Sequence, residues 1–191
     1  MPLNKNLLSD GFKDLFEGKD PAAPGETRFP PDPTEAGKKW AAVYRSYAEG
    51  AQAGVTRPVA AILSAAQNML AIALAAGFSS AQAAPPPAAI AGLAVAMDLA
   101  FVAFWLAPPV ALAAPLPPAP PTMAGIVSLA PPGVLSISLI ALFAAGPSQK
   151  KTAAQQADAI ATLLDGWTKT VMVINTPITP PGPPLPPVPL S

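Results

Sequence analysis

The middle of this chain is a long segment almost without charge, and this limits the folds that the chain can adopt. Between Arg57 and Lys150 the only Asp, Glu, Lys or Arg is Asp98. A helix of a soluble monomer normally carries charged residues along its exposed face, whereas a helix that is apolar all round is typical of an element buried on every side. Residues 58–149 therefore need cover, and the sequence leaves two sources open: other protein subunits or lipid.

The residue types that are missing narrow the classes of function. The chain has 191 residues with no Cys and no His, so it lacks disulfides, thiolate chemistry, zinc sites built on Cys or His and the commonest general base. Its formal net charge is zero, which offers no basic field for nucleic acid. The phosphate-binding motifs GxGxxG and GxxxxGK[ST] and the nucleophile motif GxSxG do not occur. We expect no enzyme, no cofactor or metal site and no small-molecule substrate.

Apolar periodicity and the positions of proline predict an all-α fold of four to five helices with long Pro-rich connections and an extended C-terminal tail. The chain has 28 prolines, and the proline clusters separate the expected elements. Helices are expected over residues 3–17, 34–54 with Thr34 as cap, 58–77, 88–107 and from Ser148 or Thr152 onward.

Three further segments are less regular. A short element capped by Thr122 is expected to be helical, residues 134–146 fit a helix or a strand, and residues 170–176 are a β-type run. We expect three regions: a docking arm and Pro-rich loop at 1–33, an apolar helical domain at 34–176 and a Pro-rich extended tail at 177–191.

Asp98 lies near the centre of an apolar helix and must have a partner, because an isolated buried carboxylate is costly. One interpretation is a proton or ion site within a membrane. The interpretation that we favour is a hydrogen bond to Arg57, to a helix N-terminus or to a neighbouring subunit.

Large aromatic residues recur on the helices, and a stripe of them at helical spacing is more often core or interface than a ligand cage. With Asp98, they form the predicted set of interface residues: Phe12, Phe16, Trp40, Tyr44, Tyr47, Asp98, Phe104, Trp105 and Trp167.

A small integral membrane protein with two or three weakly hydrophobic spans is the alternative. Residues 58–77 and 88–107 are each long enough to cross a bilayer. Against this, the connections hold no Lys or Arg for the positive-inside rule, no aromatic belts flank the segments, and the third candidate contains Pro131 and Pro132. A third hypothesis is binding of SH3-like partners through the tail sequence PPGPPLPPVP.

The order of several segments resembles small Ala- and Pro-rich helical structural proteins of tailed-phage virions, either in the tail or associated with the capsid. The resemblance lies in GF..LF at 11–16, WAAVYRSYAEG at 40–50, FWLAPPVAL at 104–112, LFAAGP at 142–147 and AIATLLDGWTKTVMV at 159–173. It implies a non-catalytic subunit present in many copies of a virion, tail or related contractile particle. Such a subunit would be assembled in the host cytoplasm and would contact copies of itself and other particle subunits through its apolar middle and its tail.

Overall fold

The computed structural model describes residues 3–19, 27–54, 56–106, 114–115, 122–128, 133–177 and 185–191. Within these residues the chain is mostly helical, as expected, with six helices and two small sheets. The helices are α1 (Lys5–Phe16), α2 (Pro33–Ala48), α3 (Ala60–Ala83), α4 (Pro86–Leu106), α5 (Val134–Gln149) and α6 (Ala153–Thr168), and the strands are β1 (Thr56–Arg57), β2 (Ala114–Pro115), β3 (Thr122–Ser128), β4 (Met172–Pro177) and β5 (Val188–Pro189).

Local capping explains where two of the helices begin. Thr152 and Gln155 form a capping box at the start of α6, which confirms Thr152 as one of the two predicted starts. Helix α2 begins at Pro33, one residue after Asp32, whose side chain accepts a hydrogen bond from the Glu35 amide at 2.8 Å. Asp32 therefore replaces the predicted cap Thr34, because Pro is well suited to the first helical position.

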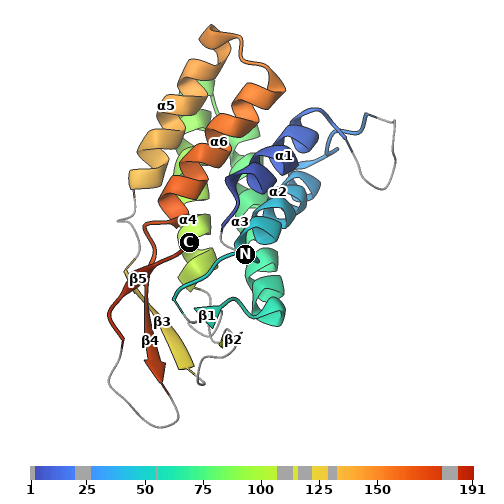
Figure 1. Ribbon diagram of the computed structural model, residues 1–191. Helices are drawn as coiled ribbons and strands as arrows, with labels where there is room; N and C mark the ends of the chain where they lie inside the picture. Colours follow the sequence, from blue (N-terminus) through green and yellow to red (C-terminus); the bar gives the residue numbers. More distant parts are fainter. Residues whose placement is uncertain are drawn as a thin grey trace.

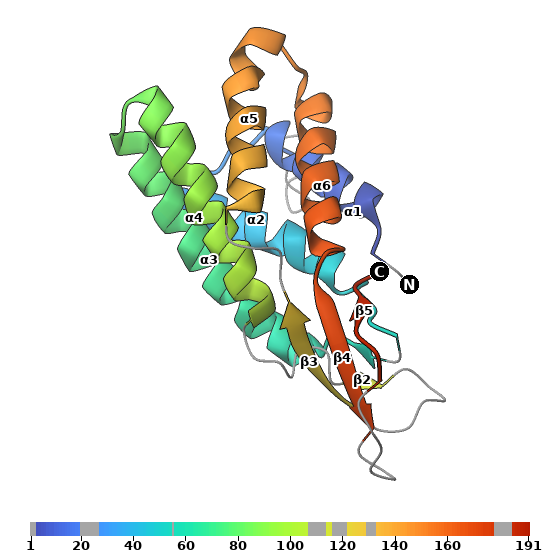
Figure 2. The same ribbon diagram turned by 90° about the vertical axis from the view of Figure 1, so that its left-hand side faces the viewer.

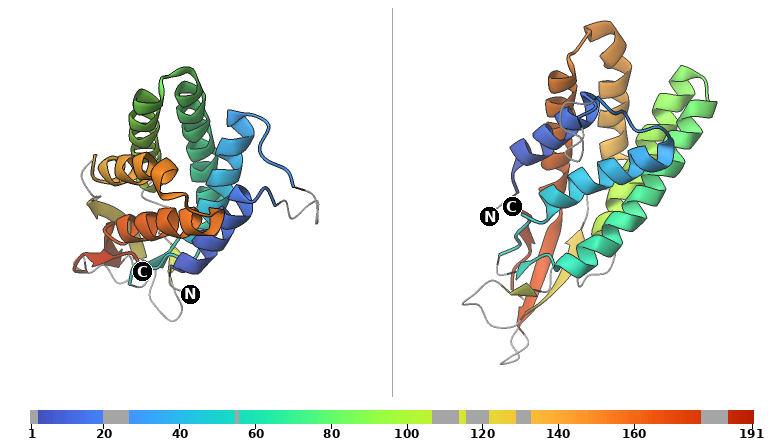
Figure 3. Two further views of the ribbon diagram at one scale, coloured as in Figure 1. Left: turned by 90° about the horizontal axis from the view of Figure 1, so that it is seen from above. Right: turned by 90° about the vertical axis from the view of Figure 1, so that its right-hand side faces the viewer.

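The helices form two hairpins with two further helices packed across them. Helices α3 and α4 run antiparallel side by side, as do α5 and α6, and α5 packs against α4 (Figures 1 and 2). Helix α2 crosses α3, and α1 lies against both α6 and α2 (Figure 3). The N-terminal helix, expected to be a docking arm, thus docks on the body of its own chain.

A close approach between α2 and α3 explains a glycine at their crossing. A Cβ on Gly37 would lie 2.5 Å from the carbonyl oxygen of Ala71 and 2.8 Å from the amide nitrogen of Ala75. Similarly, a Cβ on Gly77 would lie 2.9 Å from the Cβ of Ala96 on α4. Gly77 was the expected end of α3, but the helix continues to Ala83 because this glycine serves packing instead of termination.

The larger sheet corrects one prediction. The segment capped by Thr122 is not a helix but strand β3, which pairs antiparallel with β4, with Ile126 opposite Val173. The β-type run at 170–176 is confirmed as β4, and residues 134–146 are helical, in α5. Strand β3 could not be assigned locally because its pairing partner lies far along the chain.

The last residues of the chain return to the body (Figure 1). Val188 pairs with Val173 of β4, and the backbones of Ser191 and Gln52 exchange two hydrogen bonds of 2.9 and 3.0 Å. Leu190 is buried, with 2% of its surface exposed. Of the predicted extended tail, residues 185–191 therefore pack on their own chain, while 178–184 lie outside the described residues.

Candidate interaction surface

A buried polar network joins α2, α4 and α6 at the centre of the molecule. The Tyr44 hydroxyl accepts a hydrogen bond from Trp105 Nε1 at 2.8 Å and shares another with the Thr168 hydroxyl at 2.7 Å. All three residues are buried. Burial raises the pKa of Tyr44 well above its ordinary value, so this hydroxyl stays neutral over the physiological range. The network fixes how the three helices meet, because each buried donor or acceptor left unpaired would cost about 1–3 kcal/mol.

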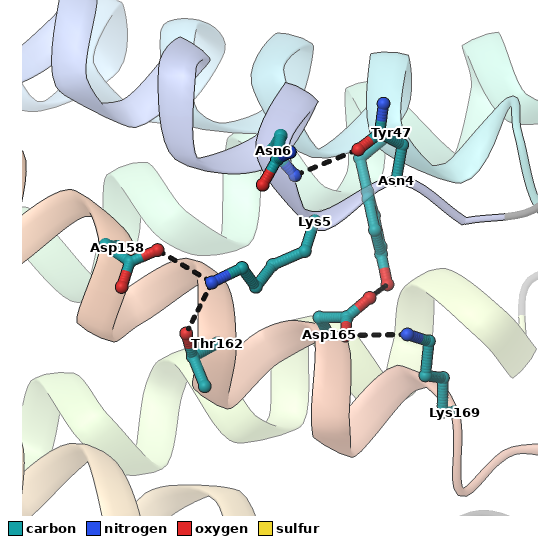
Figure 4. Close-up of polar contacts among 8 residues, drawn as sticks. All are labelled: Asn4, Lys5, Asn6, Tyr47, Asp158, Thr162, Asp165 and Lys169. Carbon is teal, nitrogen blue, oxygen red and sulfur yellow. Dashed lines mark hydrogen bonds and ion pairs between the residues drawn. The ribbon is translucent and has the colours of Figure 1, made fainter.

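A second set of polar contacts fastens α2 and α1 to α6 (Figure 4). Tyr47 donates to Asp165 Oδ1 at 2.8 Å, and Lys169 pairs with the other oxygen of the same carboxylate, also at 2.8 Å. Burial raises the pKa of Tyr47, which also keeps it a neutral donor. At the surface, Lys5 of α1 pairs with Asp158 at 2.8 Å. Both carboxylate oxygens of Asp165 therefore have partners, and the hydrogen bond from Tyr47 joins α2 to α6.

Asp98 caps a helix of its own chain. Its Oδ2 accepts hydrogen bonds from the backbone amides of Gly133, at 2.6 Å, and Ser136, at 3.2 Å, at the N-terminus of α5. The carboxylate is 2% exposed. This geometry confirms the favoured interpretation of a partner at a helix N-terminus, where unpaired amides and the helix dipole stabilise negative charge. It also places the partner within one chain.

The predicted interface residues lie inside the chain. The exposed fraction is 9% for Trp40 and lower for the other buried members of the set, while Phe16 is partly buried. The rings contact one another, with centroids 4.6 Å apart for Phe12 and Trp40 and for Tyr44 and Phe101. A side chain covered by its own chain is not available to another subunit, so these residues are corrected to core residues: Phe12, Trp40, Tyr44, Tyr47, Asp98, Phe104, Trp105 and Trp167.

A different set of apolar side chains is exposed. Helices α3, α4 and α5 present large aliphatic residues to the outside, and Ile72 and Ile137 are 72% and 70% exposed. The one charged residue on these helices, Asp98, is buried, so their exposed residues carry no charge at all. We call this the apolar outer surface, and its large members are Met69, Ile72, Val95, Leu99, Leu106, Val134 and Ile137.

The other helices differ sharply in what they expose. The exposed residues of α2 include Lys38 and Ser46, and those of α6 include Gln155, Gln156 and Asp158. The described part of the molecule is therefore two-sided, with polar helices α1, α2 and α6 and apolar helices α3, α4 and α5. Large exposed apolar side chains on the neighbouring helices α3, α4 and α5 are a common mark of an interaction site.

The charge pattern pointed to this segment but did not identify the outward-facing residues. Because α3, α4 and α5 consist largely of Ala, Leu, Ile and Val, no polar stripe marks the exposed side. The exposed members can be found only when it is known that α2 covers α3 and that α5 covers α4.

Two of these helices are also long and apolar enough to cross a membrane, Ala60–Ala83 and Pro86–Leu106. In their most apolar windows only 28% and 39% of the residues are buried within the chain. Much of their surface thus remains uncovered. Among the described residues, no group of three or more Asp and Glu side chains is placed to hold a metal ion.

In comparisons with known proteins, no family model, curated protein or solved structure matches the chain.

Proposed function

We propose that the chain is a non-catalytic structural subunit of a multi-copy particle, in which the apolar outer surface is buried against other subunits. The observation that carries this proposal is that exposed residues of three helices lack any charge while Ile72, Leu99 and Ile137 are more than half exposed. Burying one such side chain contributes about 1.5–3 kcal/mol. Several of them together supply enough free energy for stable association.

The kind of particle is proposed from the resemblance in segment order to tailed-phage structural proteins. A virion, a tail or a related contractile assembly repeats one contact many times, and an uncharged surface suits permanent contacts, since obligate interfaces are the more hydrophobic class. The two buried carboxylates, Asp98 and Asp165, have structural partners, which fits a scaffold role.

The length and apolarity of α3 and α4 favour a second candidate, an integral membrane protein. The position at which α2 crosses α3 argues against a membrane-spanning α3. The crossing of α2 at Ala71 and Ala75 lies at the middle of α3, and Arg45 of α2 donates to Gln67 of α3 at 3.1 Å. If α3 spanned a bilayer, α2 and its charged residues would lie near mid-membrane depth, where each charge costs about 2.5–3.5 kcal/mol. Protein cover avoids this cost.

Charge substitution on the apolar outer surface tests the proposal. We expect Ile72→Lys with Leu99→Lys to release the protein as a folded monomer, because an uncompensated charge in an apolar interface is strongly unfavourable. The matched control is Ala42→Lys, on the exposed side of α2. Sedimentation velocity gives the size, and circular dichroism verifies that each variant keeps its helices.

Two outcomes decide the matter. The proposal stands if the double variant dissociates while Ala42→Lys stays assembled. It fails if the double variant remains folded and assembled like the control, since the contacts between subunits would then lie elsewhere.

A further inference from the structure

A cavity of about 420 Å³ lies among the helices, and its lining includes Lys151 of the connection between α5 and α6. Its walls come from all six helices, with Trp40, Phe78, Leu93, Met97 and Phe143 among the apolar residues. Its volume falls within the range of about 300–1,000 Å³ for ligand pockets, and its lining is mostly apolar.

The lining has few polar residues, and the one charged residue among those named is Lys151. Lys151 and Gln156 are the polar residues of its lining. Gln156 donates to the Lys151 carbonyl at 3.4 Å, and the Lys151 ammonium has no ion-pair partner in the part of the chain that the structure describes. The backbone amides at the start of α6, two residues on, add partial positive charge.

We propose that this cavity binds an acyl chain that ends in an anionic group, such as a fatty acid. Apolar walls complement the hydrocarbon, and a single ammonium complements a carboxylate through a charge-assisted hydrogen bond. The cavity is separate from the apolar outer surface, so the inference does not depend on the proposed assembly role. The shared chemistry could come from a free fatty acid or from an anionic phospholipid, and the experiment distinguishes the two sources.

Isothermal titration of the full-length chain with dodecanoate, below its micellar concentration, tests the site. Lys151→Glu should weaken binding at least about tenfold, the factor that corresponds to the loss of one favourable charge contact. The matched control is Lys150→Glu, which makes the same charge change one residue away, at an exposed position that does not line the cavity. It should leave the affinity within about twofold, since an exposed charge contributes little.

Further experiments test whether the ligand occupies the cavity and which chemical class of ligand binds. Leu93→Trp fills the cavity and should abolish binding, with Leu93→Phe as a smaller filling if the first variant does not fold. Dodecanol should bind to the wild type and to Lys151→Glu alike, because it has no charge. Flotation with phosphatidylglycerol vesicles tests the lipid source: binding sensitive to Lys151→Glu assigns the ligand to the membrane, and binding of dodecanoate alone assigns a free fatty acid.

The proposal is overturned if Lys150→Glu weakens dodecanoate binding as much as Lys151→Glu, because attraction would then be a general surface effect. Full binding by both folded Leu93 variants, or no binding of dodecanoate or vesicles by the wild type, would equally reject it.

Discussion

At the scale of single residues, the buried side chains of Tyr44, Tyr47, Asp98 and Asp165 matter because each makes a defined hydrogen bond. Asp98 was conspicuous in the sequence as a lone carboxylate, and its need for a partner followed from desolvation alone. Which partner it takes depends on how α5 returns to α4, since Gly133 and Ser136 lie far along the chain. The need of Asp98 for a partner could thus be predicted from the sequence, whereas the identity of that partner depends on the tertiary structure.

Replacing Asp98 should destabilise the fold by a measurable amount. Asp98→Ala leaves the amides of Gly133 and Ser136 without their acceptor, and we expect the free energy of unfolding to fall by about 1–3 kcal/mol. Asp98→Asn keeps a carbonyl oxygen in place and should lose less. Urea unfolding at a fixed protein concentration measures the loss, and hydrogen exchange should quicken at both amides.

Asp10→Ala, on the exposed side of α1, is the control for Asp98 and should change stability by less than about 0.5 kcal/mol. Equal effects of the two alanine variants would show that the cap on α5 contributes nothing to stability.

At the scale of elements, the sequence predicts best those boundaries that depend on residues a few positions apart. The start of α6 was predictable because Thr152 and Gln155 cap it locally. Strand β3 was not, because a short segment acquires strand structure from its partner, here β4. The role of Gly77 was also hidden, since a glycine that ends a helix and one that admits a neighbouring helix look the same in a sequence.

The crossing of α2 and α3 gives a prediction at this scale. Alanine favours a helix over glycine by about 1 kcal/mol, yet we expect Gly37→Ala to destabilise the protein, because the new methyl group would meet backbone atoms of Ala71 and Ala75. Gly166→Ala in α6 is the matched control, since nothing lies within 4 Å of its added carbon. Thermal unfolding should show opposite signs for the two variants. Stabilisation by both would mean that α2 and α3 are not in close contact.

At the scale of the whole molecule, the charge gap predicted that the middle of the chain needs cover. The chain itself supplies part of it: α2 packs over α3, and α5 over α4. The aromatic residues expected at an interface fill the core instead, because large rings pack best where several helices converge. What remains uncovered is smaller and more aliphatic, the apolar outer surface of α3, α4 and α5.

We propose that protein, and not water or lipid, covers this surface. Analytical ultracentrifugation of the purified full-length chain in detergent-free buffer is the test of this proposal. We predict soluble assemblies several times larger than the 19.3 kDa chain, persisting on dilution. A monodisperse 19.3 kDa species at every concentration, or a protein that stays in solution only with detergent, would contradict it.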